Sequence, residues 1–243
     1  MDRLKSLALF AVLLGNVWSL SASNNNENED KEASKPKAKA DLTLGVTNIH
    51  YRMDPTYINY EGSLHGVREY FPIDDTTSGF SGSRYALHFG FSLRYNTNWI
   101  YGVDLAVGSN ASNISLGAGY VFGDAWESNP GFIGLVRADF SFFEITERHD
   151  FDGQTARIKN EVGGLQLTAE IRQHVFKNFG IYARFSVFEP LFASQFLEMQ
   201  RNRNFITEYD NVPYSSYTLA NPKSDGRWYN INYIISLGMV LSL

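Results

Sequence analysis

Nine ionisable side chains lie on the polar face of segments whose residues alternate between apolar and polar. Neighbouring side chains of an extended strand point to opposite faces, so all nine should share one enclosed polar surface. Unpaired charges are costly in a confined space, and we therefore expect a network of ion pairs. The nine are Arg84, His88, Arg94, Asp104, Arg137, Asp139, Glu170, Arg172 and Arg184.

Two interpretations of this charge set remain open from the sequence. Counting from the strand ends places Arg137, Glu170 and Arg184 at a similar depth on three consecutive strands. In one interpretation the charges form a polar plug that fills a narrow interior. In the other they form a gate, in which ion pairs exchange partners and open a narrow path for ions.

The sequence carries little that indicates catalysis, and we expect no enzyme, no cofactor and no metal site. His149 beside Asp150 is the one local pair with general acid–base potential, and it falls in an expected loop. Neither a Gly-x-Ser-x-Gly nucleophile motif nor a His-Glu-x-x-His metal motif occurs. The chain also has no cysteine, which excludes disulfides and thiolate chemistry.

The elements that would position these side chains are β-strands. From Tyr85 to Tyr95 every second residue is apolar and the intervening ones are small or charged, and the same period returns as far as Leu243. A helical membrane protein would instead need runs of about 20 apolar residues. The pattern predicts eight strands, near residues 41–52, 85–95, 99–107, 114–122, 131–143, 161–175, 179–188 and 229–243.

An even number of strands brings both termini of the barrel segment to the same side, and the connections then sort by side. On one side the connections are short, whereas long loops are expected on the other, near 53–82, 144–160 and 189–227. The short connection at 108–113 is the exception among the outer loops. Short turns at one rim and long loops at the other are typical of outer-membrane barrels.

Two features indicate that the apolar face is turned outward. The polar faces carry many Gly, Ala and Ser, which suit a narrow lumen better than a solvated exterior. The apolar faces carry aromatic residues near their ends, as side chains at a bilayer interface do. We therefore predict an all-β fold, a transmembrane up-and-down antiparallel barrel of about eight strands. Its aromatic girdle comprises Tyr85, Trp99, Tyr101, Tyr120, Phe122, Phe132, Phe140, Phe142, Tyr229 and Tyr233.

The segments outside the barrel have distinct compositions. The first 23 residues predict a signal peptide, because Arg3 and Lys5 precede an apolar stretch. Residues 24–40 are polar and predict a flexible periplasmic segment. The long loops mix aromatic residues with Asn, Ser and Arg, which is typical of binding surfaces, although they could equally pack on themselves and cap the barrel. Phe196 and Met199 recur at helical spacing and predict a short helix over 193–202.

Over residues 41–243 the chain resembles the small eight-stranded outer-membrane barrels of the OmpA, OmpX and OmpW kind. The final alternation from Ile235 is similar to the C-terminal signal of such barrels, although Leu243 stands where they usually end in an aromatic residue, so the subfamily stays open. The resemblance implies a bacterial outer-membrane location. It also implies outer-membrane lipid and the barrel assembly machinery as partners, the latter through the last strand.

The expected function is a structural role with surface-exposed binding loops, as in an adhesin or surface antigen that meets host or environmental ligands. A narrow porin-like channel for ions or small solutes is the alternative, and a lipid-modifying barrel enzyme is a weaker one. The net charge is −5 and no basic patch is evident, so no nucleic-acid partner is expected.

Overall fold

The computed structural model describes residues 39–53, 55–60, 73–77, 79–94, 98–122, 132–151, 154–176, 178–203, 206–212, 217–220 and 229–243. The expected signal peptide, and the expected flexible segment up to residue 38, lie outside the described residues. Lys39 and Ala40 already belong to the first strand. In the described ranges every regular element is a β-strand, and no helix there is long and apolar enough to cross a membrane.

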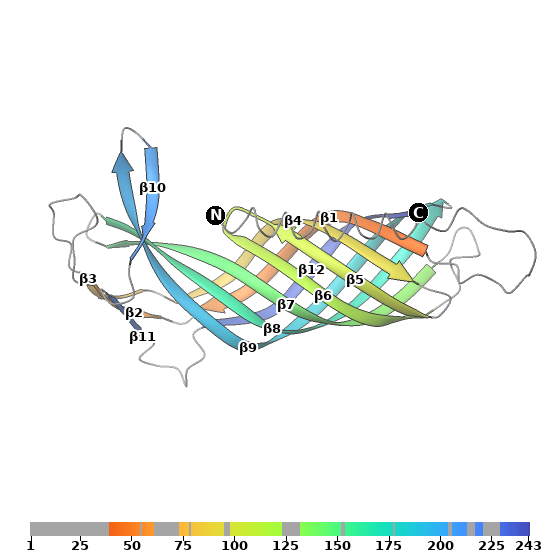
Figure 1. Cartoon of the computed structure of the whole chain (residues 1–243), viewed down its shortest axis with the longest axis horizontal. Helices are drawn as coiled ribbons and strands as arrows, with labels where there is room; N and C mark the ends of the chain where they lie inside the picture. Colours follow the sequence, from red (N-terminus) through yellow and green to blue (C-terminus); the bar gives the residue numbers. More distant parts are fainter. Residues whose placement is uncertain are drawn as a thin grey trace, which may run out of the picture. The chain divides into compact units, whose positions relative to one another are not determined.

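Eight antiparallel strands close into a ring. Each pairs with the next in the order β1, β4, β5, β6, β7, β8, β9 and β12, and β12 returns to β1. Figure 1 shows these strands crossing obliquely around one axis. The predicted all-β, up-and-down antiparallel barrel of eight strands is therefore confirmed. The bounds are β1 Lys39–Met53, β4 Phe80–Arg94, β5 Trp99–Val107, β6 Ala111–Phe122, β7 Phe132–Phe151, β8 Gln154–Phe176, β9 Phe179–Arg203 and β12 Tyr229–Ser242.

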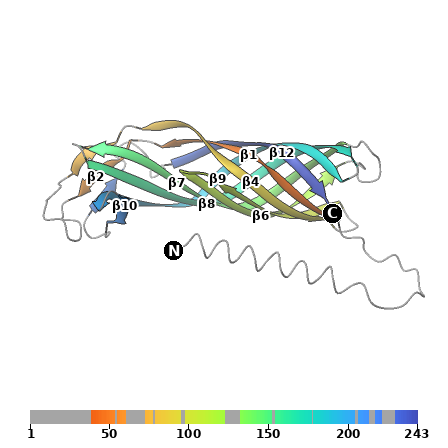
Figure 2. The same cartoon turned by 90° about the horizontal axis from the view of Figure 1, so that it is seen from above.

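Four further described strands lie outside the ring. β10 (Ile206–Asn211) pairs with the last residues of β9. β2 (Tyr57–Tyr60), β3 (Ile73–Thr76) and β11 (Tyr217–Ala220) form a separate three-stranded sheet. Figure 2 shows β2 and β10 at the end of the ring where β7 and β8 project.

These strands correct the prediction of three long outer loops. β7 and β8 continue as a paired hairpin through residues 144–160, up to the pair Phe151 and Gln154. β9 continues to Arg203, while β2 and β3 occupy parts of 53–82. We call this region the outer extension: residues 144–151 of β7, 154–162 of β8 and 192–203 of β9, together with β2, β3, β10 and β11.

The helix predicted over 193–202 is wrong, because this segment is part of β9. Phe196 and Met199 stand on opposite faces of this strand, since Phe196 is 39% exposed and Met199 is fully buried. A β-bulge lies just before the segment: Gly164 pairs with Pro190 and Gly163 with Phe192, so Leu191 is an extra residue in β9. The extra residue reverses the two faces of the strand. Phe188 is buried before the bulge, whereas Leu197 is buried after it.

The interior of the barrel changes from apolar to polar and back along its axis, and β7 passes through each layer. Side chains of one face of a strand stand at every second position, so β7 samples the whole interior. The two apolar layers that result enclose a polar one. From the short-turn end outward, the inward-facing residues of β7 are Ile133, Leu135, Arg137, Asp139, Ser141, Phe143 and Ile145, each at most 3% exposed.

The outer extension has an apolar core of its own. Ile58 of β2 packs with Ile158 of β8 and with Leu197 and Met199 of β9, and all four are fully buried. A sheet that lays an apolar face against other strands in this way forms an independent packed layer. The barrel is thus continued by a folded structure rather than by irregular loops.

Candidate functional site

Asp104 is the centre of the charge network inside the barrel. It stands on β5 and accepts from Arg137 of β7, while its Oδ1 lies 3.0 Å from Nη1 of Arg184 on β9. Nε2 of His88, on β4, is also 3.0 Å from this oxygen. The network therefore joins four strands of the ring through one carboxylate.

Glu170, on β8, links the remaining cations. Its Oε2 accepts from Nε of Arg184 at 2.5 Å, and its Oε1 accepts from Arg172. Arg172 also donates to Asp41 of β1 at 2.5 Å. Asp41, Glu170, Arg172 and Arg184 are between 1% and 6% exposed. Because each buried guanidinium meets two carboxylates or a carboxylate shared with another arginine, the cost of removing these charges from water is offset by pairing.

A layer of hydroxyl and amide groups lies beside the network on the outer side. Ser141 donates to Gln166 at 2.9 Å, and the amide nitrogen of Gln166 donates to Thr168 at 3.0 Å and to Ser186 at 3.2 Å. Thr168 in turn donates to Asp139 at 3.1 Å. These bonds satisfy buried polar groups that would otherwise be costly.

Glycines on the inner face give the large side chains their space. A Cβ atom at Gly102 would overlap the guanidinium of Arg137. A Cβ at Gly45 would come within 2.6 Å of the Tyr182 hydroxyl, and that hydroxyl lies 2.6 Å from Nδ1 of His88. The small residues of the polar faces therefore serve to admit a packed network.

The interior next to this network leaves little free volume. The hollow between His88, Asp104 and Arg184 measures about 10 Å³, which is about the space of one water molecule. On the short-turn side Ile100, Val121, Ile133 and Leu135 form one apolar layer. On the outer side a second layer closes the barrel, formed by Ile49, Tyr51, Ala111, Phe143, Ile145, Val162, Phe188 and Ile234.

Seven of the predicted charged residues come together in this network, and two lie elsewhere. Arg84 lies at the outer end of β4, where it donates to both carboxylate oxygens of Glu147 at 3.0 and 2.9 Å. Arg94 is half-buried at the opposite, short-turn end of that strand. The seven are His88, Asp104, Arg137, Asp139, Glu170, Arg172 and Arg184.

Glu170 and Arg184, two of the three residues expected at a common depth, are register partners and form an ion pair. Arg137 instead pairs with Asp104 and Asp139. Sequence reasoning missed Asp41 and Tyr182. Tyr182 has the same strand parity as Arg184, and that signal could have found it.

The outward face of the ring is an apolar belt. Tyr85, Trp99, Phe122 and Phe132 of the predicted girdle are each more than half exposed, as is Leu116 in the middle of β6. Tyr101, Tyr120 and Phe140 are also exposed, and Phe142 and Tyr233 are partly so, whereas the side chain of Tyr229 lies outside the described residues. A closed barrel with an apolar outside, a polar filled inside and short turns at one rim is the architecture of bacterial outer-membrane barrels. We place the chain in that membrane.

The outward face of the outer extension is polar and charged. Lys159 lies 3.2 Å from Glu144 and 3.0 Å from Glu161, and the guanidinium of Arg157 stands 3.3 Å from the ring centre of Tyr209. Burial raises the pKa of Glu198, the register partner of Arg157. Charged and aromatic side chains are thus mixed on one water-facing surface.

The structure places His149 and Asp150 in a strand and not in the expected loop. They are successive residues of β7, whose side chains point to opposite faces. His149 is partly buried, and burial lowers its pKa, whereas Asp150 is exposed and accepts from Thr155 at 2.6 Å. Within the described ranges, no three His, Cys, Asp or Glu side chains are placed to hold a metal ion.

No protein-family model matches the chain. No curated protein matches it in sequence either. Among solved structures, it is similar to the outer membrane protein OprG from Pseudomonas aeruginosa, with 9% identity and a TM-score of 0.46 over 86% of this chain and 97% of that one. It is also similar to Neisserial surface protein A, with 11% identity and a TM-score of 0.34 over 83% and 96%. The outer membrane protease OmpT from Escherichia coli gives 10% identity and a TM-score of 0.29 over 87% and 99%. The membrane orientation of the chain follows from its own apolar belt.

Proposed function

We propose that the chain is a non-conducting anchor in the bacterial outer membrane, and that its outer extension binds a ligand at the cell surface. One observation carries this proposal: the barrel is filled, and a folded extension continues it on the outer side. Two apolar layers and an ion-pair network occupy the lumen of the described ring, which supports a barrel that does not conduct ions. No catalytic step is part of the proposed role.

The binding surface we propose is the outward face of the extension on β7, β8 and β9. Phe196 is 39% exposed there, and the side chain of Arg148 is 63% exposed. Aromatic and arginine side chains are enriched where proteins bind partners. A surface carried on paired strands is also more rigid than a loop, which reduces the ordering cost of binding. Host or environmental ligands are the partners proposed for this face.

Two further partners belong to the proposal. Outer-membrane lipid would cover the belt, and the barrel assembly machinery would contact β12, whose outward face bears Ile235, Leu237, Met239 and Leu241. These two partners concern the insertion of the barrel into the membrane and its residence there. They do not depend on the ligand of the extension.

The test combines conductance with adhesion. In planar bilayers, the full chain and its Glu170→Ala variant should both show near-zero single-channel conductance. A gate would instead conduct in the wild type or open when Glu170, which bridges Arg172 and Arg184, is removed.

Adhesion is measured with cells that express the chain, on immobilised fibronectin, laminin and collagen. Arg148→Ala with Phe196→Ala should reduce the adhesion, whereas the lipid-facing control Leu237→Ala should not. Two results together would contradict the proposal. They are a persistent single-channel conductance of the wild type, and adhesion equal to that of cells lacking the protein.

A further inference from the structure

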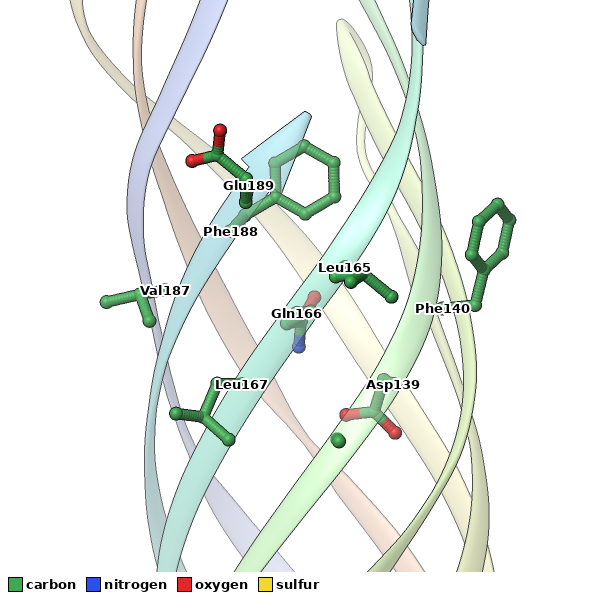
Figure 3. A pocket seen from close by; sticks show the side chains of 9 residues that line it. Asp139, Phe140, Leu165, Gln166, Leu167, Val187, Phe188 and Glu189 are labelled. Carbon is green, nitrogen blue, oxygen red and sulfur yellow. The ribbon is translucent and has the colours of Figure 1, made fainter. Parts of the chain in front are cut away.

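A hollow of about 500 Å³ lies in the wall formed by β7, β8 and β9. Two rows of side chains in register border it: Ala138, Leu167 and Val187 form one row, and Phe140, Leu165 and Glu189 form the other. Figure 3 labels five of these residues, Leu167, Val187, Phe140, Leu165 and Glu189, on neighbouring strands. Between the rows run Asp139, Gln166 and Phe188, whose side chains are buried toward the interior and which also border the hollow.

The hollow belongs to the lipid-facing surface of the barrel. Leu165 and Leu167 are 55% and 54% exposed, and Phe140 and Val187 are 49% and 43% exposed, as are many other side chains of the belt. Ala138 supplies no side chain beyond Cβ, and this leaves space between larger neighbours. Because the hollow is continuous with a surface that hydrocarbon covers, its occupant comes from the bilayer. Its volume is within the roughly 300–1,000 Å³ of small-molecule sites.

Glu189 distinguishes this hollow from the rest of the belt. It follows the outward parity of Phe185 and Val187, yet it carries a carboxylate. Among the residues that the structure describes, no cation forms an ion pair with it. At about 3.3 Å per residue and a tilt of about 40°, Glu189 stands roughly 25 Å above Phe179 at the short-turn rim. That is about the height of the apolar band, so the carboxylate reaches the outer headgroups.

We propose that this hollow binds one acyl chain of an outer-leaflet amphiphile whose headgroup carries an ammonium group. The chain lies between the rows of Ala138 and Phe140, and the ammonium pairs with Glu189. A carboxylate at the edge of a low-dielectric region favours a cationic partner over an anionic one. The site therefore selects its ligand by the charge of the headgroup at Glu189 and by the shape of the acyl chain along the rest of the hollow.

The test uses the full chain, folded in neutral detergent micelles, and two probes with the same acyl chain. Native mass spectrometry measures how much lysophosphatidylethanolamine or lysophosphatidylglycerol each folded variant retains. The wild type should retain one molecule, with about a tenfold preference for the ethanolamine lipid. Glu189→Gln should retain both probes about equally, because the amide has no charge.

Ala138→Phe should fill the hollow and lose both probes, and Ala138→Leu repeats this test with a smaller side chain should the first variant fail to fold. Ala169→Phe is the matched control, since Ala169 lies on the same outward face of β8 and borders no part of the hollow. Heat-modifiable migration on a gel verifies that each variant is folded. The proposal is overturned if the wild type retains neither probe, if Ala169→Phe loses as much as Ala138→Phe, or if Glu189→Gln keeps the preference.

Discussion

Asp104 and Glu170 each face two buried arginines, and this arrangement explains how a barrel interior holds so many charges. Removing an isolated charge from water is expensive, but a shared carboxylate lowers the cost for both of its arginines. Loss of one partner would leave an uncompensated buried charge, at a cost of roughly 3–5 kcal/mol. The network also connects β1, β4, β5, β7, β8 and β9, so it favours one arrangement of the ring over its alternatives.

Glu147 predicts a pH dependence at the outer end of the barrel. It is 6% exposed, and burial raises its pKa to about 7, although Arg84 lies within hydrogen-bond distance. The folded protein thus holds this proton more tightly than the unfolded chain, where the pKa is near 4.5. Its contribution to stability is full below about pH 4.5 and is lost as the pH rises through about 7.

The measurement is the thermal unfolding midpoint of the wild type and of Glu147→Gln between pH 4.5 and 8. The wild-type midpoint should fall more over this range than the midpoint of the variant, which has no carboxyl group to ionise. His149 and Glu198 are common to both proteins, so their titration cancels in the difference. Identical pH profiles would show that Glu147 does not titrate in this range.

The sequence predicts which face each charged residue occupies but not its depth. Parity along a strand places Arg84, Arg94 and His88 on one side of β4, and the structure agrees. Depth depends on the tilt of the strands and on the stagger between them, which no local pattern contains. For this reason Arg84 and Arg94 fall outside the network, whereas Asp41, from a strand far away in sequence, belongs to it.

The strands of the outer extension were missed for a physical reason. In the membrane part of β8, Leu165 and Leu167 point outward and Gln166 points inward, whereas beyond it Lys159 points outward and Ile158 inward. The same positions still point outward, but outward side chains change from apolar to polar and inward ones from polar to apolar, because the surroundings change from lipid to water. A search for outward apolar residues therefore ends where the membrane ends, and the bulge at Leu191 hides the continuation of β9.

Leu197 and Phe196 provide a matched pair for the core of the extension. Leu197 is fully buried in that core, whereas its neighbour Phe196 is 39% exposed on the opposite face. Leu197→Ala should destabilise the extension by about 2–5 kcal/mol, the cost of a large-to-small change in a packed core. Phe196→Ala should cost much less.

Limited proteolysis of the protein in lipid vesicles measures this difference. Leu197→Ala should be cleaved in the extension much faster than the wild type or Phe196→Ala, while its barrel keeps heat-modifiable migration. Equal cleavage of both variants would mean that the extension lacks the packed core described here.

Three strands of the ring, β7, β8 and β9, continue without interruption into the outer extension and so pass through two solvents. Inside the bilayer the ring turns apolar side chains outward and packs charges within, and outside it the same strands turn polar side chains to water around an apolar core. The eight-strand ring and its orientation could be predicted because their periodicity is uniform. The extension and the hollow beside Glu189 could not, because both depend on contacts between strands.

Spin labels on single cysteines test this orientation most directly, because the chain has no cysteine of its own. Labels would replace Leu116 and Leu237, which are 63% and 59% exposed on the belt, and Glu161 on the outward face of the extension. With the protein in lipid vesicles, power saturation compares relaxation by oxygen, which dissolves in lipid, with relaxation by a water-soluble nickel complex. Oxygen should dominate at positions 116 and 237, and nickel at position 161. Nickel relaxing the labels at 116 and 237 as strongly as the label at 161 would contradict the account.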